Sequence, residues 1–152
     1  MQRVKELFEE HKDRVYRLAL SYTGNIHDAQ DVSQEVFLRL TKWIGRVKVG
    51  SERAWLMKVT VNCCKNLRSS YTRCNTRELM ETDTVLQPER IGLAETIMCL
   101  PMDYRIVVYL FYYEEYSTKE IAKLLRVSQS TVTTRLHRAR RQLRELLKEE
   151  LE

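Results

Sequence analysis

Residues 116–143 read YSTKEIAKLLRVSQSTVTTRLHRARRQL, a stretch that predicts two helices joined by a very short turn. Ser117 is a candidate N-cap, and Glu120 three residues later completes the pattern of a capping box. The apolar side of this first helix is supplied by Ile121, Ala122, Leu124 and Leu125. After the turn at residues 126–127, Ser128 can cap a second helix that begins at Gln129. Two capped helices this close together are typical of a helix-turn-helix.

The second of these helices has two contrasting faces. At a period of 3.6 residues, the inward face consists of Val132, Leu136, Ala139 and Leu143. The opposite face carries Ser130, Thr131, Thr134 and Arg138, flanked by Arg135, His137 and Arg141. Small polar residues followed by guanidinium groups suit a helix that enters the major groove of DNA, where they contact base edges and phosphates. A solvated basic face is the simpler alternative, but its position in a capped two-helix unit favours DNA binding.

The composition is that of a soluble globular protein, with 43% hydrophobic and 31% charged residues in a chain of 152. This length allows one ordinary domain or two small ones. Four glycines and two prolines argue against many tight turns and favour a mostly helical fold. The net charge of +5 permits binding to a polyanion.

Several classes of protein are disfavoured by what the sequence lacks. No apolar run approaches the ~18 residues of a membrane span, and the first residues do not resemble a signal peptide, so we expect a cytoplasmic protein without membrane insertion. The four cysteines, Cys63, Cys64, Cys74 and Cys99, show no metal-ligand spacing. We expect them to be buried free thiols, with a redox switch at Cys63 and Cys64 as the alternative, and we expect no metal or cofactor.

The first half of the chain predicts three helices. Apolar residues recur at spacings of three and four over residues 4–22, until Gly24 and Asn25 end one helix and cap the next. The second helix, residues 26–43, has an apolar side and a polar, partly acidic side. That polar side includes Asp28, Asp31, Gln34 and Glu35. Such a face suits a partner helix that carries basic residues.

A basic loop, residues 44–50, leads to a third helix capped by Ser51. The predicted buried side of this helix consists of Trp55, Leu56, Val59, Cys63 and Leu67. Basic and polar residues of the loop and helix could hold a nucleic-acid backbone, and we select Arg46, Lys48, Lys58, Asn62 and Lys65 as candidates. Trp43 and Trp55 could stack on bases, but helical spacing favours a place in the core. Residues 1–75 hold fourteen Lys and Arg against eight Asp and Glu, which gives a net charge of +6. This positive charge needs an explanation separate from the helix-turn-helix.

Helical periodicity fails over residues 73–91, which we interpret as an interdomain linker long enough to span up to ~60 Å. A second domain then resumes, with Pro88 and Pro101 each at the first turn of a helix. The inner stripe after Pro101 is predicted to contain Ile106, Val107, Leu110, Phe111 and Tyr113. The helix-turn-helix follows.

Both halves resemble known regions of bacterial RNA polymerase sigma factors. The residues that resemble region 4 are Leu100, Pro101, Tyr104, Arg105, Leu110, Ser117, Glu120, Ile121, Ala122, Leu125, Ser128, Thr131, Val132, Arg135, Leu136, Arg138, Ala139, Arg140 and Leu143. The residues that resemble region 2 are Asp28, Ala29, Asp31, Gln34, Glu35, Val36 and Phe37 in one helix, and Trp55, Leu56, Val59, Asn62, Leu67 and Arg68 in the next. Nothing resembles regions 1 or 3, a layout similar to the extracytoplasmic-function (ECF) group. Asn66, Gln30, Ser130 and Thr133 depart from residues common in the family, so the promoter sequence is left open.

The resemblance implies an all-α protein with two small helical domains joined by a flexible linker. Residues 1–72 would be region 2, which binds core RNA polymerase at the beta-prime clamp helices through Asp28, Asp31, Gln34 and Glu35. The same region would recognise and melt the −10 element through Arg46, Lys48, Lys58, Asn62 and Lys65. Residues 92–152 would be region 4, which meets the beta flap and binds the −35 element through Ser130, Thr131, Thr134, Arg135 and Arg138. We expect this chain to be a monomer when free, and members of the group are commonly held inactive by an anti-sigma factor.

Other functions explain less of the sequence. A helix-turn-helix regulator that never contacts polymerase accounts for the second half but leaves residues 26–70 without a purpose, and such regulators usually dimerise. An enzyme would have to work with three scattered histidines, no glycine-rich phosphate loop and no metal-spaced cluster. An RNA-binding adaptor would need a recognition signature that the sequence does not contain.

Overall fold

The computed structural model describes residues 2–74 and 93–151, with side chains described within residues 2–67 and 96–148. Helices and the turns between them make up these residues, and no strand occurs among them. The chain divides into two compact units, Met1–Thr84 and Val85–Glu152. These observations confirm the prediction of an all-α fold with two small helical domains. The predicted linker, residues 73–91, lies outside the described residues except for its first two, which belong to the third helix.

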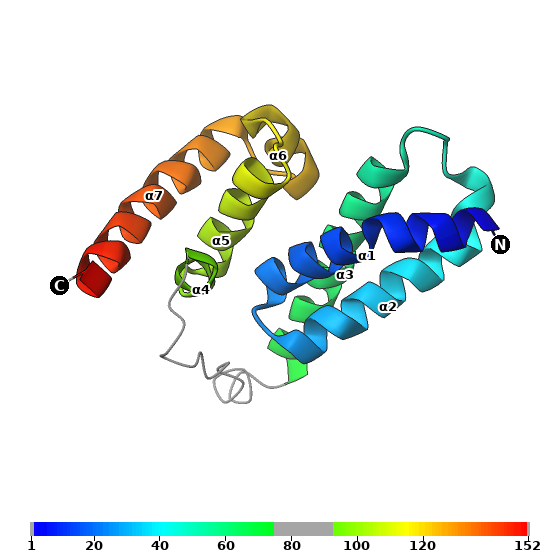
Figure 1. Cartoon of the computed structure of the whole chain (residues 1–152), viewed down its shortest axis with the longest axis horizontal. Helices are drawn as coiled ribbons and strands as arrows, with labels where there is room; N and C mark the ends of the chain where they lie inside the picture. The colour runs from blue at the N-terminus through cyan, green and yellow to red at the C-terminus, as the bar shows by residue number, and fades with distance from the viewer. Residues whose placement is uncertain (1, 75–92, 152) are drawn as a thin grey trace. The chain divides into compact units, whose positions relative to one another are not determined.

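The N-terminal unit is a bundle of three long helices, α1 (Gln2–Thr23), α2 (Ile26–Trp43) and α3 (Glu52–Cys74), with a short 3-10 helix, η1 (Ile44–Arg46), before α3. Each long helix packs against the other two, and α1 and α2 run side by side in opposite directions (Figure 1). The core contains Leu7, Val15, Leu18, Ala19, Ala29, Val32, Val36, Leu40, Leu56, Met57 and Val61. The apolar stripes of residues 4–22 and 26–43 face one another, as their periodicity predicts.

The junction between α1 and α2 forms where the sequence indicates. Gly24 adopts the left-handed conformation (φ 70°), which costs glycine little, and its amide donates to the Leu20 carbonyl at 2.8 Å. The side chain of Asn25 then accepts from the Asp28 amide at 3.1 Å and caps α2. This tight junction fixes α2 against α1 and so fixes which side of α2 faces solvent.

The buried face of α3 is broader than its sequence predicts. Leu56 and Cys63 are buried as expected, but Trp55, Val59 and Leu67 are only partly buried. Additional buried positions are Met57, Thr60, Val61 and Cys64. The reason is that α3 packs against both α1 and α2, which covers more of its circumference than one stripe. Burial raises the pKa of the Cys63 and Cys64 thiols, so both remain protonated at neutral pH, and they match the expected buried free thiols.

His11 is a buried titratable group on α1, with 5% of its surface exposed. Burial lowers its pKa below 6.5; Glu10 opposes that shift and Arg14, whose guanidinium lies 2.9 Å from Nδ1, adds to it. As the pH falls below about 6.5, the histidine of the unfolded chain takes up a proton more readily than the buried histidine of the folded chain. The free energy of unfolding is therefore highest above that pH and decreases below it.

We expect the free energy of unfolding of the N-terminal unit to decrease as the pH falls from 7 to 5.5, by no more than about 1.4 kcal/mol per pH unit for one proton. Chemical denaturation at a series of pH values measures this slope. His11→Gln should flatten it, whereas His27→Gln, at an exposed position on α2, should leave it unchanged. Identical slopes for the wild type and His11→Gln would show that His11 does not cause the dependence.

The C-terminal unit consists of α4 (Leu93–Met98), α5 (Met102–Val108), η3 (Tyr109–Tyr113), α6 (Thr118–Leu125) and α7 (Gln129–Leu151). Its core contains Ile97, Leu100, Ile106, Val107, Val108, Leu110, Ile121, Leu125, Val132, Leu136 and Ala139. Pro101 is the N-cap of α5, one position earlier than predicted, and Pro88 lies outside the described residues. The side chain of Arg105 is buried and donates to the Met98 and Leu100 carbonyls at 3.3 Å, which ties α5 to the end of α4.

The end of the α5 segment differs from the prediction because η3 is a turn of π-helix. The Glu114 amide bonds to the Tyr109 carbonyl five residues earlier, so the side chains no longer follow a period of 3.6. As a result, Tyr113, predicted to face inward, is 54% exposed, and Phe111 is only partly buried. Buried Tyr109 instead donates its hydroxyl to buried Glu114 at 2.8 Å. The prediction was also wrong for Cys99, which is exposed, while the side chain of Cys74 lies outside the described residues.

Candidate nucleic-acid interface

The helix-turn-helix forms with both predicted caps. The Glu120 amide donates to the Ser117 hydroxyl and the Ser117 amide donates to the Glu120 carboxylate, both at 3.1 Å, which completes the capping box of α6. Arg126 adopts the left-handed conformation (φ 60°), and the following amide of Val127 returns to the Ala122 carbonyl at 3.0 Å. This conformation is uncommon for a residue other than glycine, but it ends α6 abruptly enough for α7 to start three residues later.

The first turn of α7 is held by hydroxyl groups. The Ser128 hydroxyl accepts from the Thr131 amide at 3.1 Å, and it lies 2.7 Å from the Thr131 hydroxyl and 3.1 Å from that of Ser130. Gln129 donates its side-chain amide to Thr118 at 2.9 Å, which connects the starts of α6 and α7. Thr131 is consequently half-buried and locally bonded, whereas Ser130 is exposed and lies at the leading end of the helix.

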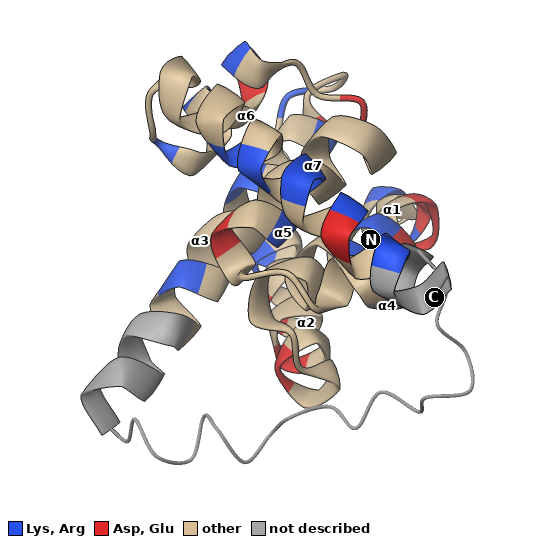
Figure 2. Cartoon of the chain, turned by 90° about the vertical axis from the view of Figure 1, so that its left-hand side faces the viewer, with Lys and Arg blue, Asp and Glu red and all other residues tan. Residues whose placement is uncertain are grey.

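Farther along α7, the inner and outer faces separate as the period predicts. Val132, Leu136 and Ala139 are buried, and Leu143 is half-buried. Thr134 and Arg138 are exposed on the outer side, and Arg135 is half-buried at its edge. Basic residues recur along α7 in Figure 2. The residues Ser130, Thr134, Arg135 and Arg138 therefore share one exposed helix surface, which we call the α7 face.

Arg140 has a different role that the sequence analysis missed. Its Nε donates to the Tyr112 hydroxyl at 2.6 Å, and its guanidinium lies 5.6 Å from the ring centres of Phe111 and Tyr112. These contacts direct Arg140 towards η3, where it can pack on aromatic rings. No sequence signal identified this pair, because the π-helical turn that presents the two rings was not predicted.

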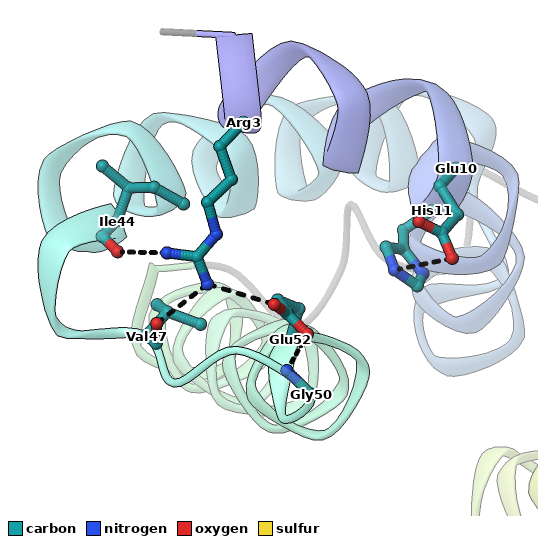
Figure 3. Close-up of polar contacts among 7 residues, drawn as sticks. All are labelled: Arg3, Glu10, His11, Ile44, Val47, Gly50 and Glu52. Carbon is teal, nitrogen blue, oxygen red and sulfur yellow. Dashed lines mark hydrogen bonds and ion pairs between the residues drawn. The ribbon is translucent and has the colours of Figure 1, made fainter.

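The basic loop of the N-terminal unit is anchored at several points (Figure 3). Arg3, at the start of α1, donates to the carbonyls of Ile44 and Val47 at 3.2 and 2.9 Å, and its guanidinium pairs with Glu52 at 3.0 Å. The second carboxylate oxygen of Glu52 accepts from the Gly50 amide at 2.8 Å. Hydrogen bonds from its own backbone amide, from Arg3 and from the Gly50 amide lower the pKa of Glu52. Between these anchors, Arg46 and Lys48 are exposed.

Trp43 lies at the end of α2, next to this loop, and is 38% exposed rather than part of the core, so that expectation was wrong. The guanidinium of Arg46 lies 5.0 Å from the indole centre, and the Lys42 ammonium lies 5.9 Å from it. Two cations thus surround an accessible aromatic ring. Trp55, the other tryptophan, is only partly buried on α3. The remaining candidates on α3 are Lys58, which is exposed, and Asn62 and Lys65, which are half-buried.

The predicted polar face of α2 is accessible. Asp31, Gln34 and Glu35 are exposed, and Asp28 is partly buried in the capped first turn. Glu35 accepts from the Arg39 Nε at 2.9 Å, one turn along the same helix. A small cavity of about 250 Å³ joins this face to α3, where Asp31, Glu35 and Arg39 meet Asn66 and Leu67.

On the other side of α2, a larger groove of about 970 Å³ lies against α1. Its residues include Phe8, Tyr16, Gln34, Phe37, Leu38 and Thr41. The rings of Phe8 and Phe37 pack edge to face with centres 4.9 Å apart, and Leu38 is 66% exposed. Gln34 therefore belongs both to the polar face and to the rim of an apolar groove.

Within the described residues, no three His, Cys, Asp or Glu side chains lie close enough together to hold a metal ion. The described helices also include none that is both long and apolar enough to cross a membrane.

Comparison with known proteins places both units in one family. Residues 7–74 match the family described as Sigma-70 region 2, and residues 90–143 match Sigma-70, region 4. The ECF RNA polymerase sigma factor SigE of Mycolicibacterium smegmatis is 34% identical over 93% of this chain, which spans 60% of SigE. SigL of Mycobacterium tuberculosis, another ECF sigma factor, is 32% identical over 96% of this chain and 89% of its own length.

The fold is also that of a solved sigma factor. RpoE of Bartonella quintana, whose structure was determined in complex with the anti-sigma factor NepR, superposes with a TM-score of 0.72 at 22% identity, over 97% of this chain and 98% of RpoE. The order of the two regions, the similarity to SigL over most of both chains and the shared fold agree with one another. The chain belongs to the ECF group of RNA polymerase sigma factors.

Proposed function

We propose that this chain binds core RNA polymerase, directs it to specific promoters and promotes the initiation of transcription. The observation that carries the proposal is the presence, in one chain, of a capped helix-turn-helix with an exposed polar and basic α7 face and a separate three-helix unit with its own basic loop. A polymerase-independent regulator needs only the first of these. Family membership accounts for both.

In this proposal residues 92–152 form region 4 and bind the −35 element through α7. The candidate contacts are Ser130, Thr131, Thr134, Arg135 and Arg138. Ser130 and Thr134 occupy the first turns, where a recognition helix meets base edges, and Arg138 lies one turn farther along. Arg135 is half-buried, so its guanidinium is better placed for a phosphate at the edge of the groove than for a base at its centre.

Residues 1–72 form region 2 in this proposal and recognise and melt the −10 element. Arg46, Lys48, Lys58, Asn62 and Lys65 supply basic and polar groups for the displaced strand. Trp43 adds an accessible indole beside Arg46, which suits stacking against an unpaired base.

Trp43→Ala should weaken the binding of a non-template −10 oligonucleotide to the holoenzyme by about 1 kcal/mol, the lower end of the range for base–aromatic stacking, because Arg46 already lies over the ring. Fluorescence anisotropy with a labelled oligonucleotide measures the change. Trp43→Phe keeps an aromatic surface and should bind nearly as well as the wild type. Equal affinities for Trp43→Ala and the wild type would exclude Trp43 from the strand-binding surface.

Core polymerase would bind along α2, where Asp28, Asp31, Gln34 and Glu35 face the beta-prime clamp helices. The exposure of Asp31, Gln34 and Glu35 supports this assignment, and the acidic side chains suit basic groups on a partner. The beta flap would meet the C-terminal unit. An anti-sigma factor is a further expected partner, since RpoE, which shares this fold, was solved with one bound.

Size-exclusion chromatography of the protein with purified core polymerase tests the proposal. The free protein should elute as a monomer and should co-elute with core enzyme when the two are mixed. A dimer that fails to bind core enzyme but still binds DNA would favour the polymerase-independent regulator.

A further inference from the structure

The network around Arg3 joins three parts of the chain that are far apart in sequence. The donor lies in the first turn of α1, and its acceptors lie 41, 44 and 49 residues later, in η1, in the loop and in α3. One guanidinium thus satisfies two backbone carbonyls and one carboxylate. A planar group with five donors is well suited to such a site, and a lysine could not reproduce the arrangement.

Glu52 extends the same network to the far end of the loop. Its two oxygens are divided between Arg3 and the Gly50 amide, at 3.0 and 2.8 Å. Gly50 has a φ of 93°, which other residues rarely adopt, so the loop turns into α3 at a position that needs glycine. The network therefore fixes the loop at residues 44, 47 and 50. The buried side chain of Val47, 5% exposed, adds an apolar anchor at the middle point.

The residues between these anchors include two of the candidate contacts to the displaced strand. Arg46 and Lys48 flank Val47, and both are exposed. Because the Val47 carbonyl is bonded and its side chain is buried, the backbone on either side of it is constrained and the two basic side chains project from a fixed base. Arg46 reaches the Trp43 indole from this position.

We propose that Arg3 and Glu52 are positioning residues for promoter melting, which hold loop 44–50 in a preformed shape so that Arg46, Lys48 and Trp43 present one surface to the displaced strand. Neither residue needs to touch DNA. A loop ordered in advance loses less conformational entropy on binding, so the network increases affinity for the single strand without adding a contact. The inference rests on the proposed function of this unit in −10 recognition.

The side chains of the pair are partly buried, 36% exposed for Arg3 and 16% for Glu52, and their partners are mainly backbone atoms of the loop. Loss of the network should therefore release the loop more than it disturbs the helix packing. The core of the unit is formed by apolar residues of α1, α2 and α3 that do not take part in it.

The test compares Arg3→Leu and Glu52→Gln with Arg17→Ala, which removes a positive charge from an exposed position on the same helix as Arg3. Each full-length protein is assembled with core polymerase. Affinity is then measured for a single-stranded oligonucleotide carrying the non-template −10 sequence and for a −35 duplex, both from a promoter mapped by its transcript start.

We expect Arg3→Leu and Glu52→Gln to weaken binding of the oligonucleotide by about tenfold, consistent with lost preorganisation, while −35 duplex affinity and core binding stay at the wild-type level. Arg17→Ala should match the wild type in all three measurements. Arg3→Lys keeps the positive charge but not the planar guanidinium with its several donors, so it should resemble Arg3→Leu.

Two results would overturn the inference. The first is wild-type affinity for the oligonucleotide in both Arg3→Leu and Glu52→Gln. The second is loss of core binding in both of these variants, which would mean that the network maintains the whole unit rather than the loop. A wild-type holoenzyme that fails to bind the oligonucleotide would instead contradict the proposed function itself. Glu52→Gln keeps the size of the side chain and leaves both Arg3–carbonyl bonds in place, so it tests the inference independently of any folding defect in Arg3→Leu.

Discussion

Ile121→Ala should unfold the C-terminal unit while leaving the N-terminal unit folded. Ile121 is completely buried on α6, between the capping box and the turn into α7. Truncating a buried isoleucine to alanine removes apolar contacts and leaves a cavity, at a cost of roughly 2–5 kcal/mol. A helical unit of this size has little stability to spare, so that cost is comparable to its whole free energy of unfolding.

The expected phenotype is loss of −35 duplex binding with part of the helical circular-dichroism signal retained, because α1, α2 and α3 belong to the other compact unit. Urea denaturation followed by circular dichroism would show an early transition absent from the wild type. Lys119→Ala, at an exposed position on the same helix, is the matched control and should shift stability by less than about 0.5 kcal/mol. A single unshifted transition in Ile121→Ala would contradict the proposed packing of the helix-turn-helix.

Arg138→Ala should weaken promoter binding by roughly 1–3 kcal/mol, the cost of a lost base contact. Arg138 is exposed on the α7 face, one turn beyond Thr134 and directly before the buried Ala139. A base contact and a phosphate contact give different results. Loss of a base contact relaxes specificity at one position, whereas loss of a phosphate contact weakens all sequences alike and flattens the salt dependence.

Competition binding of the holoenzyme to matched and mismatched −35 duplexes at several salt concentrations makes this distinction. Arg140→Ala is the informative control, because the exposed side chain of Arg140 packs on Phe111 and Tyr112 rather than lying on the α7 face, and its loss should reduce stability more than specificity. Unchanged promoter binding by Arg138→Ala would mean that the α7 face has been assigned wrongly.

Local signals in the sequence were sufficient for much of the fold. The bounds of α2, the cap at Asn25 and the capping box of Ser117 and Glu120 follow from short-range chemistry, since each depends on residues three positions apart or fewer. The buried face of α7 follows from the spacing of its apolar residues at a period of 3.6. These features also determine which side of α7 faces solvent, and so most of the candidate −35 surface.

Features that depend on distant residues or on irregular backbone could not be read in this way. The π-helical turn of η3 exposes Tyr113 and presents Tyr112 to Arg140, and nothing in the spacing of the apolar residues distinguishes it from an α-helical turn. Trp43 fits an apolar period yet lies at the end of α2, where no neighbouring helix covers it completely. Arg3 and Glu52 are 49 residues apart, and only the fold brings them together.

The most direct test of the account is run-off transcription with purified bacterial core polymerase on genomic fragments that include the region upstream of this protein's own coding sequence. We predict discrete new transcripts when the protein is present, from start sites preceded by shared −35 and −10 sequences. No transcript, together with no association with core polymerase, would contradict the assignment of this chain as a working sigma factor.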